Sequence, residues 1–208
     1  MIYIVKHREC YSPNLSGYDD LGVGKLFQHK GDNINYLNPY INEATAMYDL
    51  WKNIGDRIVG MCHYRRFFEK DGDYLQYEDA DKILKNHEII VTKDYSPPVT
   101  PYYWLSQAIP THTLEKYISE LSYDFQQWLK EPQSYNICNM FVCKPDILDD
   151  YCSWLFPTII PLADRFMRED SGKGIKNDRA LGYICEMMFG FWCRDLDKYR
   201  LDVKMLEV

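Results

Sequence analysis

A run of basic residues, His63-Tyr64-Arg65-Arg66, follows an apolar segment in the first third of the chain. The apolar segment, residues 58–62, is typical of a short strand that is buried on both faces of a sheet. Ligands of open α/β sheets bind beyond the carboxyl ends of the strands, and guanidinium groups match the geometry of phosphate. The sequence therefore predicts an anion site where this strand ends.

The side chains of the basic run should be divided between two faces if the strand continues through it. Successive strand residues point to opposite sides, so His63 and Arg65 would share one face, and Tyr64 and Arg66 the other. An imidazole beside a guanidinium favours phosphate binding. The alternative is a structural network of salt bridges, in which these cations pair with internal carboxylates.

A second apolar segment, residues 1–5, also runs into basic residues, here His7 and Arg8. The whole chain is acidic, with a net charge of −7 over 208 residues, which argues against nucleic-acid binding. We therefore expect a small anionic ligand and no nucleic acid. The length fits a single domain, residues 1–208.

The apolar runs are too short to cross a membrane, and no signal peptide begins at Met1, so we expect a cytoplasmic protein without a transmembrane segment. The seven cysteines are dispersed and form no C-x-x-C pair, which is typical of a reducing compartment. The five histidines are dispersed as well, so we expect no zinc site.

Residues 38–54 carry the clearest helical pattern. Asn38 is a suitable N-cap, Pro39 suits the first helical position, and apolar residues recur on one face until Gly55. With the strands at 1–5 and 58–62, this helix makes a βαβ-like unit, which predicts an α/β fold with a mixed, mostly parallel sheet flanked by helices. Further helices are expected at 79–86, 114–129, 147–167 (interrupted by Pro157 and Pro161) and 178–193, further strands at 88–92 and 135–143, irregular chain at 9–30 and 95–104, and a polar tail after 193.

Several acidic and amide residues are candidates for chemistry. Glu43, like Asn42, faces away from the apolar side of its helix, so it either binds sugar hydroxyls or is solvated. Asp71-Gly72-Asp73 matches a D-x-D metal pair in letters, but an exposed turn is the better explanation. Asn139 lies in an apolar segment and needs a partner, either neighbouring backbone or a polar cleft. Motifs of serine hydrolases, phosphate-loop kinases and Rossmann dehydrogenases are absent.

Motifs along nearly the whole chain resemble the DUF4422 family of bacterial capsular and exopolysaccharide glycosyltransferases. The residues that carry the resemblance are Gly31-Asp32-Asn33-Ile34, Asn38-Pro39-Tyr40, Glu43, Thr45, Tyr48, Trp51-Lys52-Asn53, Gly60, His63-Tyr64-Arg65-Arg66-Phe67, Asn139-Met140-Phe141, Tyr151-Cys152, Trp154-Leu155-Phe156, Gly182-Tyr183 and Glu186.

This resemblance implies a GT-A-like nucleotide-diphosphosugar transferase that moves a hexose from its donor to a saccharide or lipid-linked saccharide acceptor. It also implies a place in capsule, exopolysaccharide or O-antigen synthesis, with a peripheral position at the inner membrane face as an alternative to the free cytoplasm. Cations at the strand end would replace the usual metal, so we expect no required cofactor, with Mn²⁺ or Mg²⁺ the less favoured alternative.

On this basis the acceptor-side acid or base is predicted to be Asp178, with Glu43 as the competitor. A catalytically idle relative that binds a nucleotide sugar or a partner protein is the main alternative function, and a phosphate-ester hydrolase is a weaker one. The predicted nucleotide-sugar-binding residues are His7, Arg8, Asp32, Asn33, Asn42, His63, Tyr64, Arg65, Arg66 and Asn139.

Overall fold

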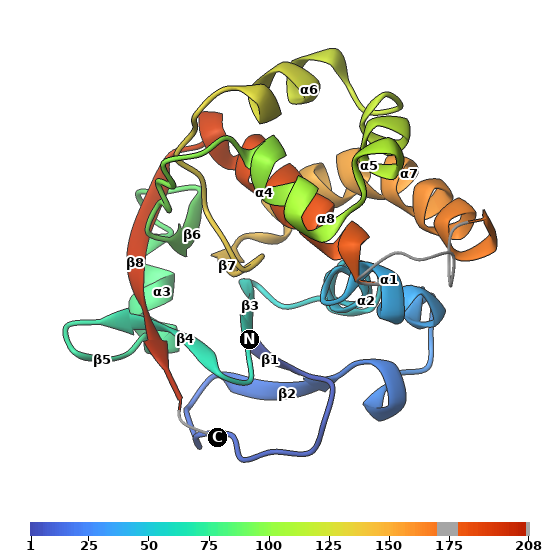
Figure 1. Ribbon diagram of the computed structural model, residues 1–208. Helices are drawn as coiled ribbons and strands as arrows, with labels where there is room; N and C mark the ends of the chain where they lie inside the picture. Colours follow the sequence, from blue (N-terminus) through green and yellow to red (C-terminus); the bar gives the residue numbers. More distant parts are fainter. Residues whose placement is uncertain (170–178, 207–208) are drawn as a thin grey trace.

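The computed structural model describes residues 1–169 and 179–206 and arranges them around an eight-stranded sheet (Figure 1). Four of the strands are not among the expected ones: the two short strands that begin at or after the end of the basic run, a strand inside the irregular stretch 9–30, and a strand in the polar tail. The strands are β1 (Ile2–Lys6), β2 (Tyr18–Gly22), β3 (Val59–His63), β4 (Arg66–Lys70), β5 (Asp73–Tyr74), β6 (Ile89–Thr92), β7 (Phe141–Cys143) and β8 (Lys198–Met205).

The strand order is β2-β1-β3-β7-β6-β8-β4-β5, with an additional contact between β3 and β4. The β1–β2, β1–β3 and β6–β8 pairs are parallel, and the remaining pairs are antiparallel. The observed sheet is mixed, as predicted. The prediction that it is mostly parallel is wrong, because most of its strand pairs are antiparallel. The physical reason is that β4 follows β3 after only two residues, whereas a parallel neighbour needs a long crossover.

Helices cover both faces of this sheet. Strands β1 and β3 are buried on both faces, as predicted: Tyr3 and Met61 pack into one core, and Ile4 and Cys62 pack into the other. Helix α3 contributes to the second core, whereas the other helices pack on the first. The helices are α1 (Asn38–Ile41), α2 (Ala44–Asn53), α3 (Tyr77–Ile83), α4 (Pro101–Ala108), α5 (Thr111–Ile118), α6 (Tyr123–Lys130), α7 (Pro145–Glu169) and α8 (Ala180–Trp192), with short 3-10 turns at Gly24–Leu26, Asn35–Leu37 and Cys193–Asp195.

Two predicted helices are each divided in the structure. The helix expected at 38–54 breaks between α1 and α2, where Asn42 has a φ of 54°. The helix expected at 114–129 is α5 followed by α6, and Ser122 caps the second by accepting a hydrogen bond from the Phe125 backbone N–H at 3.4 Å. The apolar periodicity predicted the buried faces but not these breaks, because both segments keep the same face toward the core.

Two segments that contain prolines are more helical than predicted. Helix α7 runs without interruption through Pro157 and Pro161, both of which are exposed, so the backbone carbonyls freed by the missing N–H groups can meet water. Helix α4 begins at Pro101 within the stretch expected to be irregular. The Thr100 side chain caps it by accepting from the Tyr103 backbone N–H at 3.1 Å.

Strand β8 is the largest departure from the expected elements. It lies between β6 and β4 and pairs with both. Most of its side chains are polar or partly exposed, and only Leu201 is buried. The sequence therefore lacks the alternation of apolar residues that would predict a strand here. Its position is decided by backbone pairing with two strands that lie far away in the sequence.

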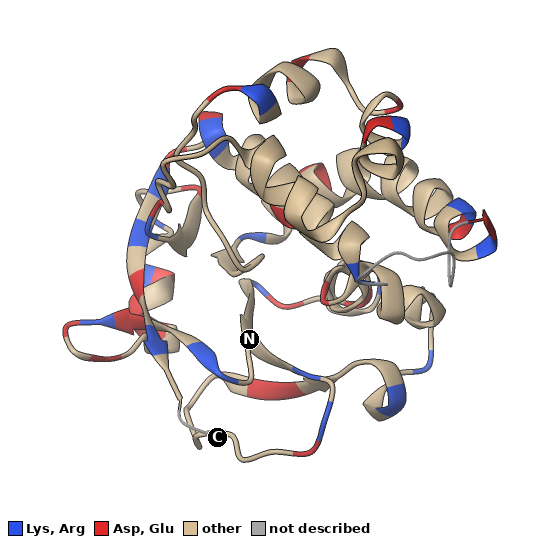
Figure 2. Cartoon of the chain, viewed as in Figure 1, with Lys and Arg blue, Asp and Glu red and all other residues tan. Residues whose placement is uncertain are grey.

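Charged residues are spread over most elements of the chain, whereas helix α4 carries none and helix α8 only Glu186 (Figure 2). Within residues 1–169 and 179–206, no helix is both long and apolar enough to cross a membrane.

Candidate functional site

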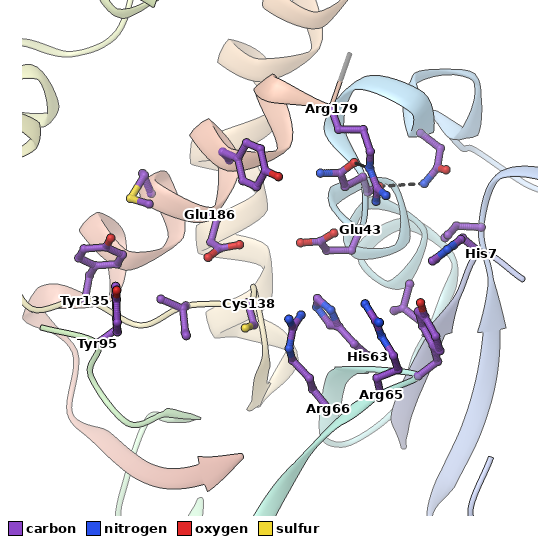
Figure 3. Close-up of a pocket in the computed structure, with 18 of the residues that line it drawn as sticks. His7, Glu43, His63, Arg65, Arg66, Tyr95, Tyr135, Cys138, Arg179 and Glu186 are labelled. Carbon is purple, nitrogen blue, oxygen red and sulfur yellow. Dashed lines mark hydrogen bonds between the residues drawn. The ribbon is translucent and has the colours of Figure 1, made fainter. Parts of the chain in front are cut away.

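The basic run lines a cavity of about 440 Å³ at the carboxyl ends of β1 and β3 (Figure 3). The β1 end contributes His7, and the β3 end contributes His63 and the residues that follow it. The junction of α1 with α2 and the helices α4 and α8 supply the other walls. The strand end therefore carries a built cavity at the place where the sequence predicted an anion site.

A two-residue hairpin turn, Tyr64-Arg65, shapes the basic run. His63 and Arg66 are directly paired across the hairpin, so their side chains lie on the same face. The prediction that His63 shares its face with Arg65 and not with Arg66 assumed a continuing strand, and it is wrong because the chain reverses after His63. All four residues of the run line the cavity.

The buried ring of Tyr64 supports the surrounding basic side chains. The guanidinium carbons of Arg8 and Arg65 lie 5.3 and 5.1 Å from its centroid, within the range of cation–π contacts. The His7 ring meets it edge to face at 5.1 Å. Tyr64 therefore holds Arg8, which follows β1, and Arg65, which follows β3, close to each other.

The two arginines of the basic run, Arg65 and Arg66, line the cavity. Among the residues that the structure describes, neither Arg65 nor Arg66 forms an ion pair with a carboxylate. Arg179, at the start of α8, lines the same cavity and donates from Nε to the side-chain oxygen of Asn42. A structural salt-bridge network therefore does not account for Arg65 and Arg66, which favours the interpretation that they bind a ligand.

The two imidazoles of the cavity are neutral near pH 7. Burial holds the pKa of His63 below its usual range, and Arg66 and Arg65 act in the same direction against the opposing charge of Glu43. Burial also lowers the pKa of His7, helped by Arg179, Arg8 and Arg65. The buried Nε2 of His63 has no hydrogen-bond partner among the described residues, and a buried polar nitrogen of this kind requires one.

Two carboxyl groups, those of Glu43 and Glu186, lie across the cavity from Arg65 and Arg66 (Figure 3). Burial raises the pKa of Glu186 to about 7, and the negative charge of Glu43 adds to this effect. A hydrogen bond from the Cys138 backbone and the charge of Arg66 partly oppose it. Glu186 is thus poised to take up or release a proton near neutral pH, as a general acid or base requires.

The predicted strand at 135–143 begins only at Phe141, and the residues before it form a turn. Cys138 and Asn139 have φ values of 73° and 49°, a left-handed conformation that a strand does not contain. Asn139 donates from Nδ2 to Oε1 of Glu43 at 3.0 Å. The partner that Asn139 needed is therefore a cavity carboxylate, and binding of sugar by Asn139 stays a prediction.

Asn42 occupies a backbone conformation that favours glycine, with φ 54° and ψ −131°. Its carbonyl accepts hydrogen bonds from Asn38 Nδ2 at 2.9 Å and from Thr45 Oγ1 at 2.8 Å, which hold this geometry. A Cβ placed on Gly182 would lie 1.8 Å from Asn42 Nδ2, so α8 approaches here because residue 182 is glycine. The strained turn thus presents the Asn42 side chain to Arg179.

Replacement of Asn42 separates its backbone role from its side-chain role. We expect Asn42→Gly to keep the free energy of unfolding within about 1 kcal/mol of the native value, because glycine adopts this φ without strain. We expect Asn42→Ala to be the less stable variant by about 1 kcal/mol. Both variants should bind a nucleoside diphosphate more weakly, since Arg179 loses its hydrogen bond to the Asn42 side chain. Urea unfolding and calorimetric titration measure the two effects, and a native affinity in Asn42→Gly would contradict the positioning role.

The other predicted site residues lie away from the cavity or outside the described chain. Arg8 contacts the cavity residue Tyr64 without lining the cavity itself. Asp32 accepts from the Tyr48 hydroxyl at 3.0 Å, and Asn33 bonds its own loop through the Gly31 carbonyl at 3.0 Å. The ligand roles of these three residues stay predictions. Asp178 lies outside the described residues.

Three cavity residues at the start of α8 or within it were not among the predicted site residues: Arg179, Tyr183 and Glu186. One signal for Glu186 was available in the sequence, because it is the single charged residue in the thirteen-residue helix Ala180–Trp192. A lone acid in an apolar helix requires a polar environment on one side. Nothing in the local sequence distinguishes Arg179 from other arginines at the start of a helix.

The residues that match the D-x-D pattern, Asp71-Gly72-Asp73, lie in the hairpin that connects β4 with β5. Both carboxylates are exposed, and neither lines the cavity. The left-handed φ values of Asp71 (54°) and Gly72 (85°) suit a tight hairpin turn. Within the described ranges, no group of three or more His, Cys, Asp or Glu side chains could hold a metal ion.

Fold and site together define a class: an α/β protein with a cavity at the ends of its first strands, in which arginines lie close to partly buried carboxyl groups. The family can also be stated. The chain belongs to the DUF4422 family, described as a domain of unknown function, whose model matches residues 1–198.

A solved structure, the apo form of the bifunctional glycosyltransferase WbbM, shares this fold. The TM-score is 0.77 at 23% sequence identity, and the match covers 100% of this chain and 45% of the WbbM chain. The chain thus spans less than half the length of that protein. No curated protein sequence matches the chain.

Proposed function

We propose that the protein is a glycosyltransferase that moves a sugar from a nucleotide-diphosphate donor to a saccharide acceptor. The observation that carries this proposal is the meeting of Arg65, Arg66 and Arg179 with Glu43 and Glu186 in one cavity. Cleaving a sugar from a diphosphate requires stabilisation of the anion that leaves and removal of a proton from the attacking hydroxyl. The likeness of the fold to part of a glycosyltransferase supports the same assignment.

The arginines are suited to the diphosphate. Their guanidinium groups are permanently charged and can bind phosphate oxygens in pairs. In the proposed reaction the bond between the anomeric carbon and the diphosphate oxygen breaks, and the arginines neutralise the charge that this oxygen gains. His63 lines the same wall of the cavity, and its Nε2 has no hydrogen-bond partner among the described residues.

Glu186 is the proposed base. As the new bond forms between the acceptor oxygen and the anomeric carbon, the carboxylate of Glu186 takes the hydroxyl proton. Glu43 keeps the pKa of Glu186 high by its negative charge, after the larger effect of burial, and is itself held by Asn139. This assignment moves the acid–base role from the predicted Asp178 and Glu43 to Glu186, with Glu43 in support.

The finer features of the proposal follow from the family resemblance in the sequence. We infer a GT-A-like enzyme that transfers a hexose to a saccharide or lipid-linked saccharide during capsule, exopolysaccharide or O-antigen synthesis. Its place would be the cytoplasm, with a peripheral position at the inner membrane face as the alternative. The likeness to WbbM, a glycosyltransferase, is compatible with these features. The experiment that tests the core of the proposal is release of nucleoside diphosphate from a panel of nucleotide sugars. We expect release that depends on an added saccharide acceptor.

An idle relative would bind nucleoside diphosphates without releasing them from any donor. A phosphate-ester hydrolase would release product at the same rate with and without acceptor. Either result would overturn the transferase proposal.

We further propose that the arginines replace a catalytic metal. The D-x-D letters lie in a distant hairpin turn, whereas the cations line the cavity itself. We expect transferase activity to stay within about twofold of its starting value after treatment with EDTA, since Arg65, Arg66 and Arg179 supply the positive charge. The measurement is initial rate before chelation, after chelation, and after addition of Mn²⁺ or Mg²⁺. Loss of activity that either ion restores would contradict the metal-independent mechanism.

A further inference from the structure

The cavity has two chemically different ends. Figure 3 shows Arg65 and His7 on one side, Tyr95 and Tyr135 on the other, and the carboxyl groups between them. Trp104 and Tyr183 also line this cavity. The aromatic end, defined as Tyr95, Trp104, Tyr135 and Tyr183, comes from four separate segments: the loops after β6 and before β7, and the helices α4 and α8.

The rings of the aromatic end are held in place, and two of them, Tyr95 and Trp104, are partly open to solvent, whereas Tyr135 is buried. Tyr95 and Tyr135 exchange backbone hydrogen bonds at 2.8 and 3.1 Å, and their ring centroids are 6.0 Å apart. The Trp104 and Tyr183 centroids are 6.4 Å apart. Trp104 is 41% exposed and Tyr95 40% exposed, although both line a cavity. Rigid aromatic surface with polar edges, left accessible, is a feature of ligand-binding sites.

The position of Glu186 links this end to the proposed chemistry. Burial raises the pKa of Tyr135 to about 12, and the charge of Glu186 is the next contributor, so this carboxyl group lies close to the aromatic end. On its other side, Glu186 interacts with Glu43 and Arg66. A ligand group that rests on the aromatic rings is therefore next to the proposed base and separated by it from the arginines.

The covalent order of the substrates then identifies that ligand group. In a nucleotide sugar, the diphosphate stands between the ribose and the transferred sugar. With the diphosphate on the arginines and the reacting carbon at the carboxyl groups, the nucleobase extends away from the carboxyl groups. The group beyond Glu186 must instead carry the hydroxyl that loses its proton, which is the acceptor.

We propose that the aromatic end of the cavity is the acceptor subsite and that it binds a saccharide ring through its apolar C–H face. This inference rests on the proposed transferase function and specifies its second substrate. The ring stacks on Trp104 and Tyr183, and its hydroxyl groups reach Glu186 and the phenol groups of Tyr95 and Tyr135. An aliphatic acceptor would not use the flat faces of these rings, whereas a sugar presents both an apolar face and a polar edge.

Variants of two adjacent residues of α4 test this subsite. Trp104→Ala removes a ring that lines the cavity, whereas Tyr103→Ala removes a ring that is 52% exposed and does not line it. The probes are the methyl glycosides of glucose, galactose, mannose and N-acetylglucosamine, followed by saturation-transfer NMR, together with UDP and GDP, followed by calorimetry. All are added to the full chain.

We expect at least one glycoside to receive saturation from the native protein. Its binding should weaken by about tenfold in Trp104→Ala, the loss that removal of an aromatic contact produces, and should be unchanged in Tyr103→Ala. The affinity of both variants for UDP or GDP should stay within about twofold of the native value. Competition between glycoside and nucleotide should be absent, because the two occupy opposite ends of the cavity.

Three results would overturn the acceptor subsite: no glycoside signal with the native protein, a signal that Trp104→Ala leaves unchanged, or a weaker nucleotide affinity in Trp104→Ala. The last result would place the nucleobase on the aromatic rings. Failure of the transferase proposal has a different signature. The native protein would then release no nucleoside diphosphate from any donor, or would release it at the same rate without an acceptor, while the glycoside result stood by itself.

Discussion

Replacement of Glu186 by glutamine is expected to lower kcat for sugar transfer by about 10²- to 10⁴-fold, because the amide cannot accept the proton of the acceptor hydroxyl. Glutamine keeps the size of the side chain and part of its hydrogen bonding to the Cys138 backbone. The affinity for the nucleoside diphosphate should therefore change little. Initial rates at saturating donor and acceptor measure the loss in kcat.

The pH profile distinguishes a base from a structural role of Glu186. The carboxyl group must be ionised to accept a proton, and its pKa is about 7. We therefore expect kcat of the native enzyme to rise with pH and to level off above about pH 7. The residual activity of Glu186→Gln should lack this rise. An unchanged pH profile in the variant would assign the base to another residue.

The same substitution should change stability in the opposite direction. Because the pKa of Glu186 is raised on folding, the folded state binds more protons than the unfolded state between about pH 4.3 and pH 7. The native free energy of unfolding therefore loses this contribution as pH rises through that window. Glutamine does not ionise, so Glu186→Gln should be the more stable protein above pH 7 by on the order of 2 kcal/mol. Urea unfolding at pH 5 and pH 8 measures the difference, and equal stabilities at pH 8 would contradict the burial of a charged carboxylate.

Replacement of Arg66 by alanine is expected to weaken nucleoside-diphosphate binding by about 10- to 100-fold, the loss that follows removal of a hydrogen-bonding partner of a charged group. Arg66 begins β4, is half-buried, and faces both His63 and Glu186. Its removal also withdraws the positive charge that lowers the pKa of Glu186. The rise of kcat with pH should thus move to higher pH in the variant. Calorimetric titration with UDP and GDP gives the affinity, and the pH profile of transfer gives the second effect.

Arg57 supplies the matched control. It lies just before β3, is exposed, and pairs with Asp81 on the surface. We expect Arg57→Ala to bind nucleoside diphosphates like the native protein. If Arg66→Ala also kept native affinity, the cation cluster would have a structural role and the diphosphate would bind elsewhere. A similar loss in both variants would indicate a general effect of net charge.

Local sequence patterns determined part of this protein directly. The apolar segment before His63 specified a strand buried on both faces, because every side chain of such a strand must avoid water. The change to basic residues at its end predicted the place of the cavity. The hydrophobic periodicity of residues 38–54 predicted which face of the chain enters the core, and the family motifs predicted DUF4422 membership, which the family model confirms.

Only the tertiary structure decided how these parts meet. The hairpin turn at Tyr64-Arg65 places Arg66 beside His63, and backbone pairing, which has no local signature, inserts β8 into the sheet. Helix α8 lies more than a hundred residues from Glu43, yet it brings Glu186 to the opposite wall of the same cavity. The sequence showed both acids, but a pKa of about 7 arises from burial and from the approach of Glu43, which are properties of the folded chain alone. The basic residues at the end of β3 therefore form one wall of the site, and the packing of α8 supplies the opposite wall with Glu186.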